Sequence, residues 1–286
     1  MNHEGRIIAA HGRHYLVDIG SGEPLPCVTR GKKSDVACGD WVEVMPTSDD
    51  QGVIESILPR RQLLYRSNET RQKLIAANVD QVIIVTACAP AFSDDLVTRA
   101  IIAAESEEIE ILLVLNKCDL AENLPQARAQ LAVFAHLGYP VLELSARSSA
   151  APLRPWLQGK TSVLVGQSGM GKSTLINTLI PDAGAATREI SKALDSGKHT
   201  TTHATLYTLD AESFLIDSPG LQEFGLAHLE RGEIEYAFRE FRPYLGRCRF
   251  RNCRHGQEPG CALRPALETG EIDKTRFASY VRLVNL

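Results

Sequence analysis

The sequence lacks any apolar run that approaches the roughly 20 residues of a membrane-spanning helix. Its N-terminus lacks the charged, apolar and small-residue regions of a secretory signal peptide. Cysteine is sparse and odd in number, with seven in 286 residues, and four of them are scattered along the chain. This usage argues against a disulfide framework and for a reducing compartment. Together these absences predict a cytoplasmic protein with no membrane partner.

Excess positive charge is also missing, because the formal net charge is −4, which gives no overall reason to expect nucleic acid. Two stretches are nevertheless basic. Residues 239–254 contain six arginines and one acid, and residues 60–73 contain five basic residues and one acid. Such local faces suit a phosphate-rich partner, although an ordinary solvated surface explains them equally well.

The length and the hydrophobic share of 44% allow about two or three domains with a sizeable core. In residues 1–62, short runs rich in β-branched residues alternate with Gly, Ser and Asp turns, which predicts about five strands and an OB-like β-barrel. Such barrels often bind oligonucleotides, so RNA binding is a hypothesis for this region. Arg30, Lys32 and Lys33 share one loop that could meet an RNA backbone or merely solubilise the barrel.

The central region, residues 63–225, alternates predicted strands and helices. Apolar runs at 79–86 and 109–115 predict buried strands, and residues 95–106 predict a helix between them. This alternation indicates an α/β domain with a parallel sheet, whose ligands bind at the carboxyl ends of the strands.

A phosphate-binding loop follows a third apolar run at residues 161–165. Its glycines let successive N–H groups point at a phosphate, and the helix that begins after it favours anions through its dipole. Lys172 can reach the β- and γ-phosphates, and Ser173 can ligate Mg²⁺. The loop residues predicted to bind nucleotide are Gly166, Gln167, Ser168, Gly169, Met170, Gly171, Lys172, Ser173 and Thr174.

The strand at 109–115 runs into Asn116, Lys117, Cys118 and Asp119, the guanine-reading motif of GTPases. The Asp119 carboxylate can accept hydrogen bonds from guanine N1–H and the 2-amino group, a donor pair that adenine lacks. Lys117 would pack over the base, and Asn116 would tie the loop to its neighbours. Ser145 and Ala146 end a further strand and resemble the loop that backs the guanine.

Two later segments complete the set of GTPase motifs. Asp217 and Gly220 form an Asp-x-x-Gly motif, in which Asp217 holds Mg²⁺ through water and the Gly220 N–H faces the γ-phosphate. In the polar segment before it, either Thr200 or Thr201 would ligate Mg²⁺. Because Asn116 precedes the phosphate loop, the reverse of the usual order, these motifs predict a circularly permuted GTPase domain.

The position after Gly220 departs from the Ras-like pattern. Leu221 stands where a glutamine would orient the attacking water, so intrinsic hydrolysis should be slow and another group must act. His199 is the candidate catalytic residue beside Lys172, because its imidazole titrates near neutral pH. A structural or partner-contacting role for His199 is the alternative.

The last region, residues 226–286, contains four metal-ligand types in close succession: Cys248, Cys253, His255 and Cys261. Three thiolates and one imidazole complete a tetrahedral Zn²⁺ shell, which predicts one structural ion and a small zinc-binding domain; reduced free thiols are the alternative. A segment this short should have little core without the metal, so zinc should drive its folding. Residues 272–286 predict a final helix. Four arginines interleave with the ligands and suggest an RNA-contact surface: Arg247, Arg249, Arg251 and Arg254.

A barrel, a permuted GTPase and this cysteine–histidine spacing together resemble the bacterial RsgA family of small-ribosomal-subunit biogenesis GTPases. The resemblance runs along essentially the whole chain, and residues 76–81, 199–202, 217–224 and 244–261 carry it most specifically. It implies GTP hydrolysis stimulated by the 30S subunit, a late role in 30S maturation, and a monomeric cytoplasmic protein. The alternative is a nucleotide-gated RNA-binding module in which hydrolysis is incidental, a reading that Leu221 favours.

Overall fold

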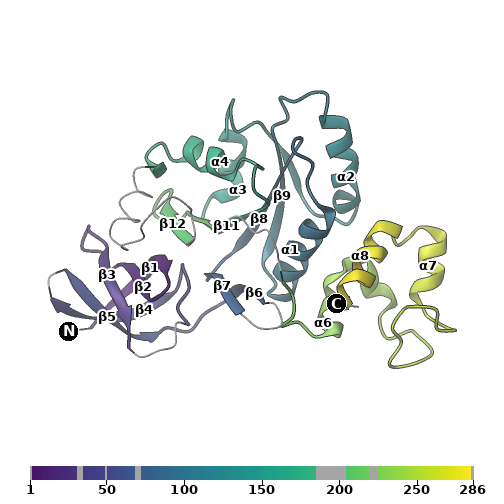
Figure 1. Ribbon diagram of the computed structural model, residues 1–286, viewed down its shortest axis with the longest axis horizontal. Coiled ribbons are helices and arrows are strands. Elements are labelled where there is room, and N and C mark those ends of the chain that lie inside the picture. The colour runs from purple at the N-terminus through teal and green to yellow at the C-terminus, as the bar shows by residue number, and fades with distance from the viewer. Residues whose placement is uncertain are drawn as a thin grey trace.

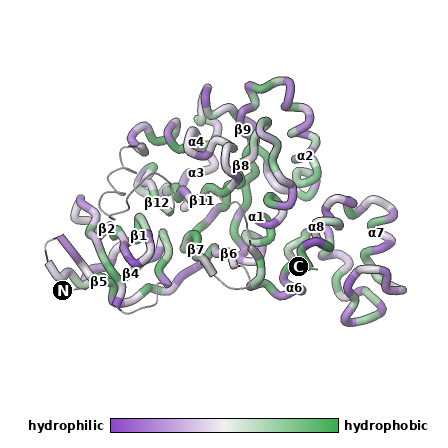
Figure 2. The backbone as a smooth tube through the Cα atoms, in the orientation of Figure 1, coloured by the Kyte–Doolittle hydropathy of each residue, from purple (hydrophilic) through white to green (hydrophobic). Residues whose placement is uncertain are grey.

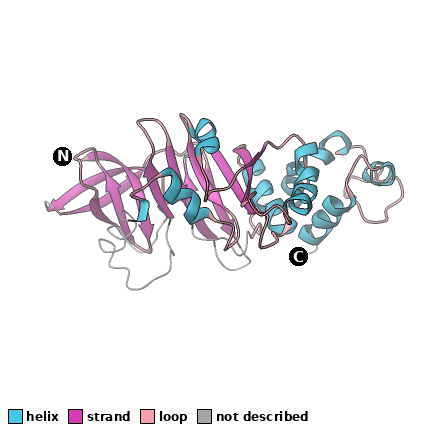
Figure 3. Ribbon diagram, turned by 90° about the horizontal axis from the view of Figure 1, so that it is seen from above, coloured by secondary structure: helices cyan, strands magenta, loops and turns pink. Residues whose placement is uncertain are grey.

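The computed structural model describes residues 2–30, 35–48, 50–67, 72–184, 204–218 and 225–284. A β-barrel lies at the N-terminal end, a central sheet follows, and a helical region lies at the opposite end (Figures 1 and 3). Within these residues, no helix combines the length and apolar character needed to cross a membrane.

The predicted N-terminal barrel is confirmed. β1 pairs with β2 along one part of its length and with β4 along another, which closes the sheet in the order β1-β2-β3-β5-β4. Alternation is clear at the start of β4, whereas β2 buries three successive residues; inward-facing side chains such as Tyr15, Val17 and Val42 form a separate buried core. The strands are β1 (His3–His11), β2 (His14–Asp18), β3 (Leu25–Thr29), β4 (Trp41–Ser48) and β5 (Gln51–Ile57).

The central sheet is parallel except for β12, and its described strands follow the order β10-β9-β8-β11-β13-β12. Every residue of β8 and β11 is buried, as near-continuous apolar runs require, and Figure 2 shows hydrophobic residues along these strands. All the parallel strands therefore end at one edge. The strands are β8 (Gln81–Ala87), β9 (Glu110–Asn116), β10 (Val141–Glu143), β11 (Thr161–Val165), β12 (Ala204–Thr208) and β13 (Phe214–Asp217).

Helices cover this sheet and connect its strands. Ser93 caps the first of them by accepting a hydrogen bond from the Leu96 N–H, and two acidic residues in its first turn complement the helix dipole. The helices are α1 (Asp94–Ser106), α2 (Leu124–His136), α3 (Arg154–Leu157), which continues a 3-10 turn η1 (Ala151–Leu153), and α4 (Lys172–Leu179).

The barrel is joined to the central sheet by backbone and side-chain contacts. Antiparallel pairing of Ala9 with Thr205 makes β1 the neighbour of β12, so one hydrogen-bonded sheet runs through both regions. At the other end of the interface the buried Arg6 donates to the Thr161 hydroxyl at 2.9 Å, and its guanidinium lies 4.2 Å from the centre of the Phe214 ring. These contacts hold the barrel at a defined angle to the sheet.

A two-stranded hairpin, β6 (Leu63–Ser67) and β7 (Gln72–Ala77), lies beneath α1. Its Ser67 N–H donates to the carbonyl of Gly225, and the Ala227 N–H donates to the carbonyl of Ser67. The segment that follows the Asp-x-x-Gly motif is therefore attached to this hairpin before it reaches the C-terminal helices.

The C-terminal region adds aromatic side chains to the apolar core of the central domain. Phe238, Phe241 and Tyr280 are fully buried and their rings pack within 6 Å of one another. The predicted last helix is present but begins at Lys274, and the buried Ile272 precedes it. The helices are α6 (Arg231–Ala237), the 3-10 segment η2 (Arg239–Tyr244), α7 (Leu263–Thr269) and α8 (Lys274–Val284).

This region is fixed to the central domain by buried charges. Arg276 donates to Glu240 at 2.7 Å and to the Thr98 hydroxyl of α1 at 2.9 Å, and both charged side chains are at most 3% exposed. The expectation that the region has little core without metal stays a prediction, because its buried aromatic side chains belong to the same apolar cluster as the central domain. Domain limits at residues 62 and 225 stay a prediction.

Candidate functional site

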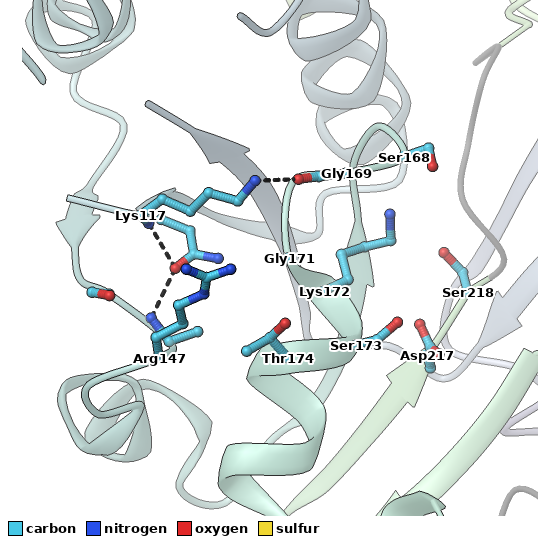
Figure 4. A pocket seen from close by; sticks show the side chains of 13 residues that line it. Lys117, Arg147, Ser168, Gly169, Gly171, Lys172, Ser173, Thr174, Asp217 and Ser218 are labelled. Carbon is cyan, nitrogen blue, oxygen red and sulfur yellow. Dashed lines mark hydrogen bonds between the residues drawn. The ribbon is translucent and has the colours of Figure 1, made fainter. Parts of the chain in front are cut away.

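A cavity of about 380 Å³ opens at the edge where the parallel strands end. Loops that follow β9, β10, β11 and β13 converge on it, although they are far apart in the sequence (Figure 4). The residues that line it are Asn116, Lys117, Ser145, Ala146, Arg147, Ser168, Gly169, Gly171, Lys172, Ser173, Thr174, Asp217 and Ser218.

The glycines at both ends of the phosphate loop are required by close approaches. Gly166 has φ of 149°, and a Cβ there would lie 2.3 Å from the Val85 carbonyl oxygen. Gly171 has φ of 95°, and a Cβ there would lie 2.3 Å from Nδ2 of Asn116. Any side chain at Gly171 would therefore push the guanine motif away from the phosphate loop.

Lys172 begins α4 and folds back over its own loop. Its Nζ donates to the carbonyls of Gly166, at 2.5 Å, and Gln167, at 3.0 Å. Burial lowers the pKa of Lys172, and the nearby Asp217 carboxylate opposes that shift. The ammonium is thus held at the loop by weak carbonyl acceptors that a phosphate could replace.

Asp217 is the last residue of β13, where it is paired with Leu164 of β11 and Thr205 of β12. Burial raises the pKa of Asp217 to about 6, and the charge of Lys172 acts in the opposite direction. Ser173 and Asp217 both line the cavity, and in Figure 4 their side chains point into the same part of it. A hydroxyl and a carboxylate are oxygen donors of the kind that Mg²⁺ prefers.

Asn116 joins three of the converging loops through one buried side chain. Its Nδ2 donates to the Met170 carbonyl at 2.9 Å, and its Oδ1 accepts from the N–H groups of Lys117, at 2.8 Å, and Ala146, at 2.9 Å. Lys117 adds a second link, because its Nζ donates to the Gly169 carbonyl at 2.7 Å (Figure 4). It also donates to the Ala89 carbonyl at 2.7 Å. The guanine motif, the Ser145-Ala146 loop and the phosphate loop therefore form one assembly.

Asp119 lies at the exposed rim of this assembly. The Ser145 hydroxyl donates to its Oδ1 at 2.5 Å, and this bond, followed by a backbone N–H, lowers the pKa of the Asp119 carboxyl. Cys118 instead points its thiol at the Leu115 carbonyl, 3.2 Å away, and burial raises its pKa to about 12. Of Cys118 and Asp119, only Asp119 therefore presents a polar group that a nucleotide could contact.

Three predicted loop residues shape the cavity from behind rather than line it. Gly166 approaches Val85, the Gln167 Oε1 accepts from the Ser93 N–H at 2.8 Å, and Met170 is 1% exposed. Two residues that sequence reasoning missed do line it, namely Arg147 and Ser218. Arg147 directly follows Ala146, and Ser218 directly follows Asp217. This adjacency to a motif residue is the sequence signal that could have identified them.

Four predicted residues lie outside the described part of the chain: His199, Thr200, Thr201 and Gly220. Their assignments, catalytic for His199 and nucleotide or Mg²⁺ binding for the others, stay predictions. Lys172, the other predicted catalytic residue, lies in the cavity beside Asp217.

The four predicted metal ligands do come together. Ligand atoms of Cys248, Cys253, His255 and Cys261 all lie within 4.8 Å of one another. The His255 Nδ1 is 3.6 Å from the Cys248 sulfur and 3.4 Å from the Cys261 sulfur, and backbone N–H groups donate to the sulfurs of Cys253 and Cys248. Three soft sulfurs and one nitrogen around one point fit a tetrahedral metal site, so this cluster could hold a metal ion.

Comparisons with known proteins agree with this geometry. The family model described as RsgA GTPase matches residues 57–227. Two similar proteins are named small ribosomal subunit biogenesis GTPase RsgA. The one from Nitrosospira multiformis is 55% identical, over 98% of this chain and 90% of that protein. The one from Burkholderia pseudomallei strain 668 is 57% identical, over 99% of this chain and 91% of that protein.

Two solved structures share the fold over all of this chain. YjeQ from Thermotoga maritima is 30% identical with a TM-score of 0.73 and is covered completely. YloQ, described as a circularly permuted GTPase, is 28% identical with a TM-score of 0.71 and is covered to 94%. The motif order of the loops around the cavity is the order that such a permutation produces. The chain therefore belongs to the RsgA family of GTPases.

Proposed function

We propose that this GTPase hydrolyses GTP in the biogenesis of the small ribosomal subunit and that the subunit stimulates the reaction. The observation that carries the nucleotide assignment is the Asn116 side chain, which bonds the guanine motif to both the Ser145-Ala146 loop and the phosphate loop. The ribosomal assignment comes from the names of the relatives. We expect a monomer that acts in the cytoplasm, as membership of the RsgA family implies.

Guanine would occupy the end of the cavity at Lys117, Ser145 and Ala146, with the exposed Asp119 carboxylate reading its N1–H and 2-amino group. The Ser145 hydroxyl holds Asp119 by one oxygen, which leaves the other oxygen and further lone pairs for the base. An adenine would present no such donors to this carboxylate, so ATP should bind poorly. Arg147 lines the same end and offers its guanidinium to the nucleotide.

The phosphates would lie along the loop from Gly166 to Thr174. To reach them, Lys172 must exchange the carbonyls of Gly166 and Gln167 for phosphate oxygens, which are stronger, charged acceptors. Ser173 and Asp217 would hold Mg²⁺, with Thr200 or Thr201, and the ion supplies charge stabilisation for phosphoryl transfer. Gly220 would face the γ-phosphate.

The chain must supply a group that positions the attacking water, because Leu221 cannot. We assign this role to His199, on the sequence alone. Dependence on a group outside the phosphate loop and the Asp-x-x-Gly motif would explain slow basal hydrolysis and a need for the ribosomal subunit.

The surface around the metal cluster is the proposed rRNA contact. Arg247, Arg249, Arg251 and Arg254 are exposed, and the Arg249 guanidinium stacks over Phe250, whose side chain is 43% exposed. Exposed arginine and aromatic faces suit phosphates and unpaired bases. The four ligands Cys248, Cys253, His255 and Cys261 would hold one structural Zn²⁺ that fixes this loop.

Not every arginine of the basic stretch belongs to that surface. Arg239 and Arg242 both donate to the half-buried Glu105 at 2.6 Å, which fastens η2 to α1. In the other basic stretch, Arg60 bonds to the buried Asp40. The charged face available to RNA is therefore smaller than the sequence indicates.

Phosphate release from GTP, measured with and without purified 30S subunits, tests the proposal. We expect slow release alone, a large increase with 30S, and none in either case for Lys172→Ala, because the phosphate charge loses its partner. His199→Ala should lose the stimulated rate while it still binds GTP. A rate that 30S subunits leave unchanged would favour the nucleotide-gated RNA-binding module instead.

A further inference from the structure

The His255 imidazole has two faces with different surroundings. Its Nδ1 points at the sulfurs of Cys248 and Cys261, so this nitrogen faces the position of a bound metal. Its Nε2 points the other way, to Oε1 of Glu235, at 3.5 Å, the outer limit of a direct hydrogen bond. Glu235 belongs to α6 and lies outside the segment that carries the metal ligands.

Glu235 is itself held by two further donors. The Tyr280 hydroxyl donates to Oε1 at 2.7 Å, and Arg231 Nε donates to the same oxygen at 2.7 Å. Arg231 also reaches the metal segment, because its Nη2 donates to the Cys253 carbonyl at 3.0 Å. One carboxylate oxygen therefore receives donors from α6, from α8 and from the ligand histidine.

We propose that Glu235 is the outer-shell positioning residue of the zinc site. As acceptor for the Nε2–H of His255, its carboxylate selects the tautomer that leaves Nδ1 unprotonated for the metal, and it orients the ring toward the three thiolates. Metal-bound histidines usually donate their second N–H to a carboxylate or carbonyl, and this partner raises the basicity of the ligand. The inference rests on the proposed zinc site and names a residue of this chain that no ligand spacing reveals.

The arrangement links the metal to the C-terminal core. Glu235 connects His255 to Tyr280, and Tyr280 packs edge-on against Phe238 and Phe241. The metal segment is therefore anchored to α6 and α8 at the ligand that the carboxylate orients. Loss of Glu235 should weaken the metal site while the aromatic core stays in place.

Zinc affinity of the full-length protein, measured by competition with a chromophoric chelator, tests the proposal. We expect one zinc per wild-type chain and an affinity about 10- to 100-fold weaker for Glu235→Ala. Glu235→Gln should lose less, because the amide oxygen still accepts the N–H but carries no charge. Glu233→Gln is the matched control on the same helix: its amide can keep the capping box with Glu230, and its affinity should equal that of wild type.

A second measurement separates positioning from simple destabilisation. Side-chain ¹⁵N shifts of His255 should report one tautomer in zinc-loaded wild type and in Glu233→Gln. The d–d absorption of the cobalt-substituted protein should change in Glu235→Ala, and Tyr280→Phe, which removes one donor to Glu235, should change it less. Circular dichroism and nucleotide binding check that each variant is folded.

Failure of the zinc assignment and failure of the Glu235 assignment give different results. A wild-type protein that binds no zinc would overturn the proposed metal. Wild-type zinc affinity and an unchanged cobalt spectrum in Glu235→Ala would overturn the role of Glu235 while the zinc site stands. A variant that melts at a lower temperature but binds zinc as wild type does would also overturn it.

Discussion

Replacement of Asn116 by alanine should weaken nucleotide binding through loss of the assembly rather than loss of a ligand contact. The side chain is buried and makes three hydrogen bonds, two of which cross between loops: to the Met170 carbonyl and from the Ala146 N–H. Alanine leaves that carbonyl and that N–H without partners. The loops can recover hydrogen bonds by separating into water, and nucleotide binding must then bring them back together.

The size of the effect follows from those two groups. An unsatisfied buried polar group costs about 1–3 kcal/mol, so two cost about 2–6 kcal/mol. Since 1.4 kcal/mol corresponds to a factor of ten, we expect affinity to fall by at least about 30-fold. GTP and GDP should lose affinity alike, because the broken bonds join the guanine motif to its neighbouring loops and do not involve the γ-phosphate.

Titration with a fluorescent GDP analogue, followed by competition with GTP, measures both affinities. Asn123→Ala provides a control, because Asn123 is exposed and its side chain does not cap α2. An Asn116→Ala protein whose affinities stay within about threefold of wild type would refute the reasoning, since that change is worth only about 0.7 kcal/mol.

Four further predictions follow from the same structure. Asp119→Ala should let ATP compete for the site, which displacement of a labelled guanine nucleotide measures; ATP that already competes equally against wild type would contradict guanine reading. Because burial raises the pKa of Asp217 to about 6 and Mg²⁺ needs its ionised form, Mg²⁺-dependent GTP affinity should rise with pH up to about 6 and level off above it; a flat profile from pH 5 to 8 would be inconsistent. In urea denaturation, Arg276→Ala should lower the free energy of unfolding by about 3–5 kcal/mol, because Glu240 is left buried without its partner. The double variant Arg276→Met with Glu240→Leu should recover most of that lost stability. Affinity for 30S subunits should differ by roughly 5- to 150-fold between GDP and a non-hydrolysable GTP analogue at fixed salt, because the segment after Asp217 leads to the C-terminal region. Equal affinities would show that the nucleotide site is not coupled to the C-terminal region.

The chemistry of the nucleotide site could be predicted from the sequence because its motifs are local. Glycine spacing, Lys172 and Ser173 form a working loop within nine residues, and the strand before and the helix after it follow from hydrophobic periodicity. The order of the motifs likewise indicated the permutation. The strands of the barrel were predictable for the same reason, since alternation along each strand encodes which side is buried.

Contacts between distant segments could not be predicted. No local pattern places Gly171 against Asn116, or β12 against β1, because each depends on how separately folded segments pack. The short strand Ala204–Thr208 was not predicted from the sequence. The aromatic packing of the C-terminal region was not predicted, because Phe238, Phe241 and Tyr280 come together only when α6, η2 and α8 meet.

The sequence by itself determined which chemical groups each motif carries: phosphate donors, a guanine-reading carboxylate and four metal ligands. Tertiary structure alone decided which charged side chains are available to bind a partner. Arg239 and Arg249 look equivalent in a basic stretch, yet the first is neutralised by Glu105 and the second is exposed beside Phe250. It also brought Glu235 to His255. Composition counts charges along the chain, whereas desolvation and pairing act in space, so only the folded arrangement separates a structural arginine or glutamate from a functional one.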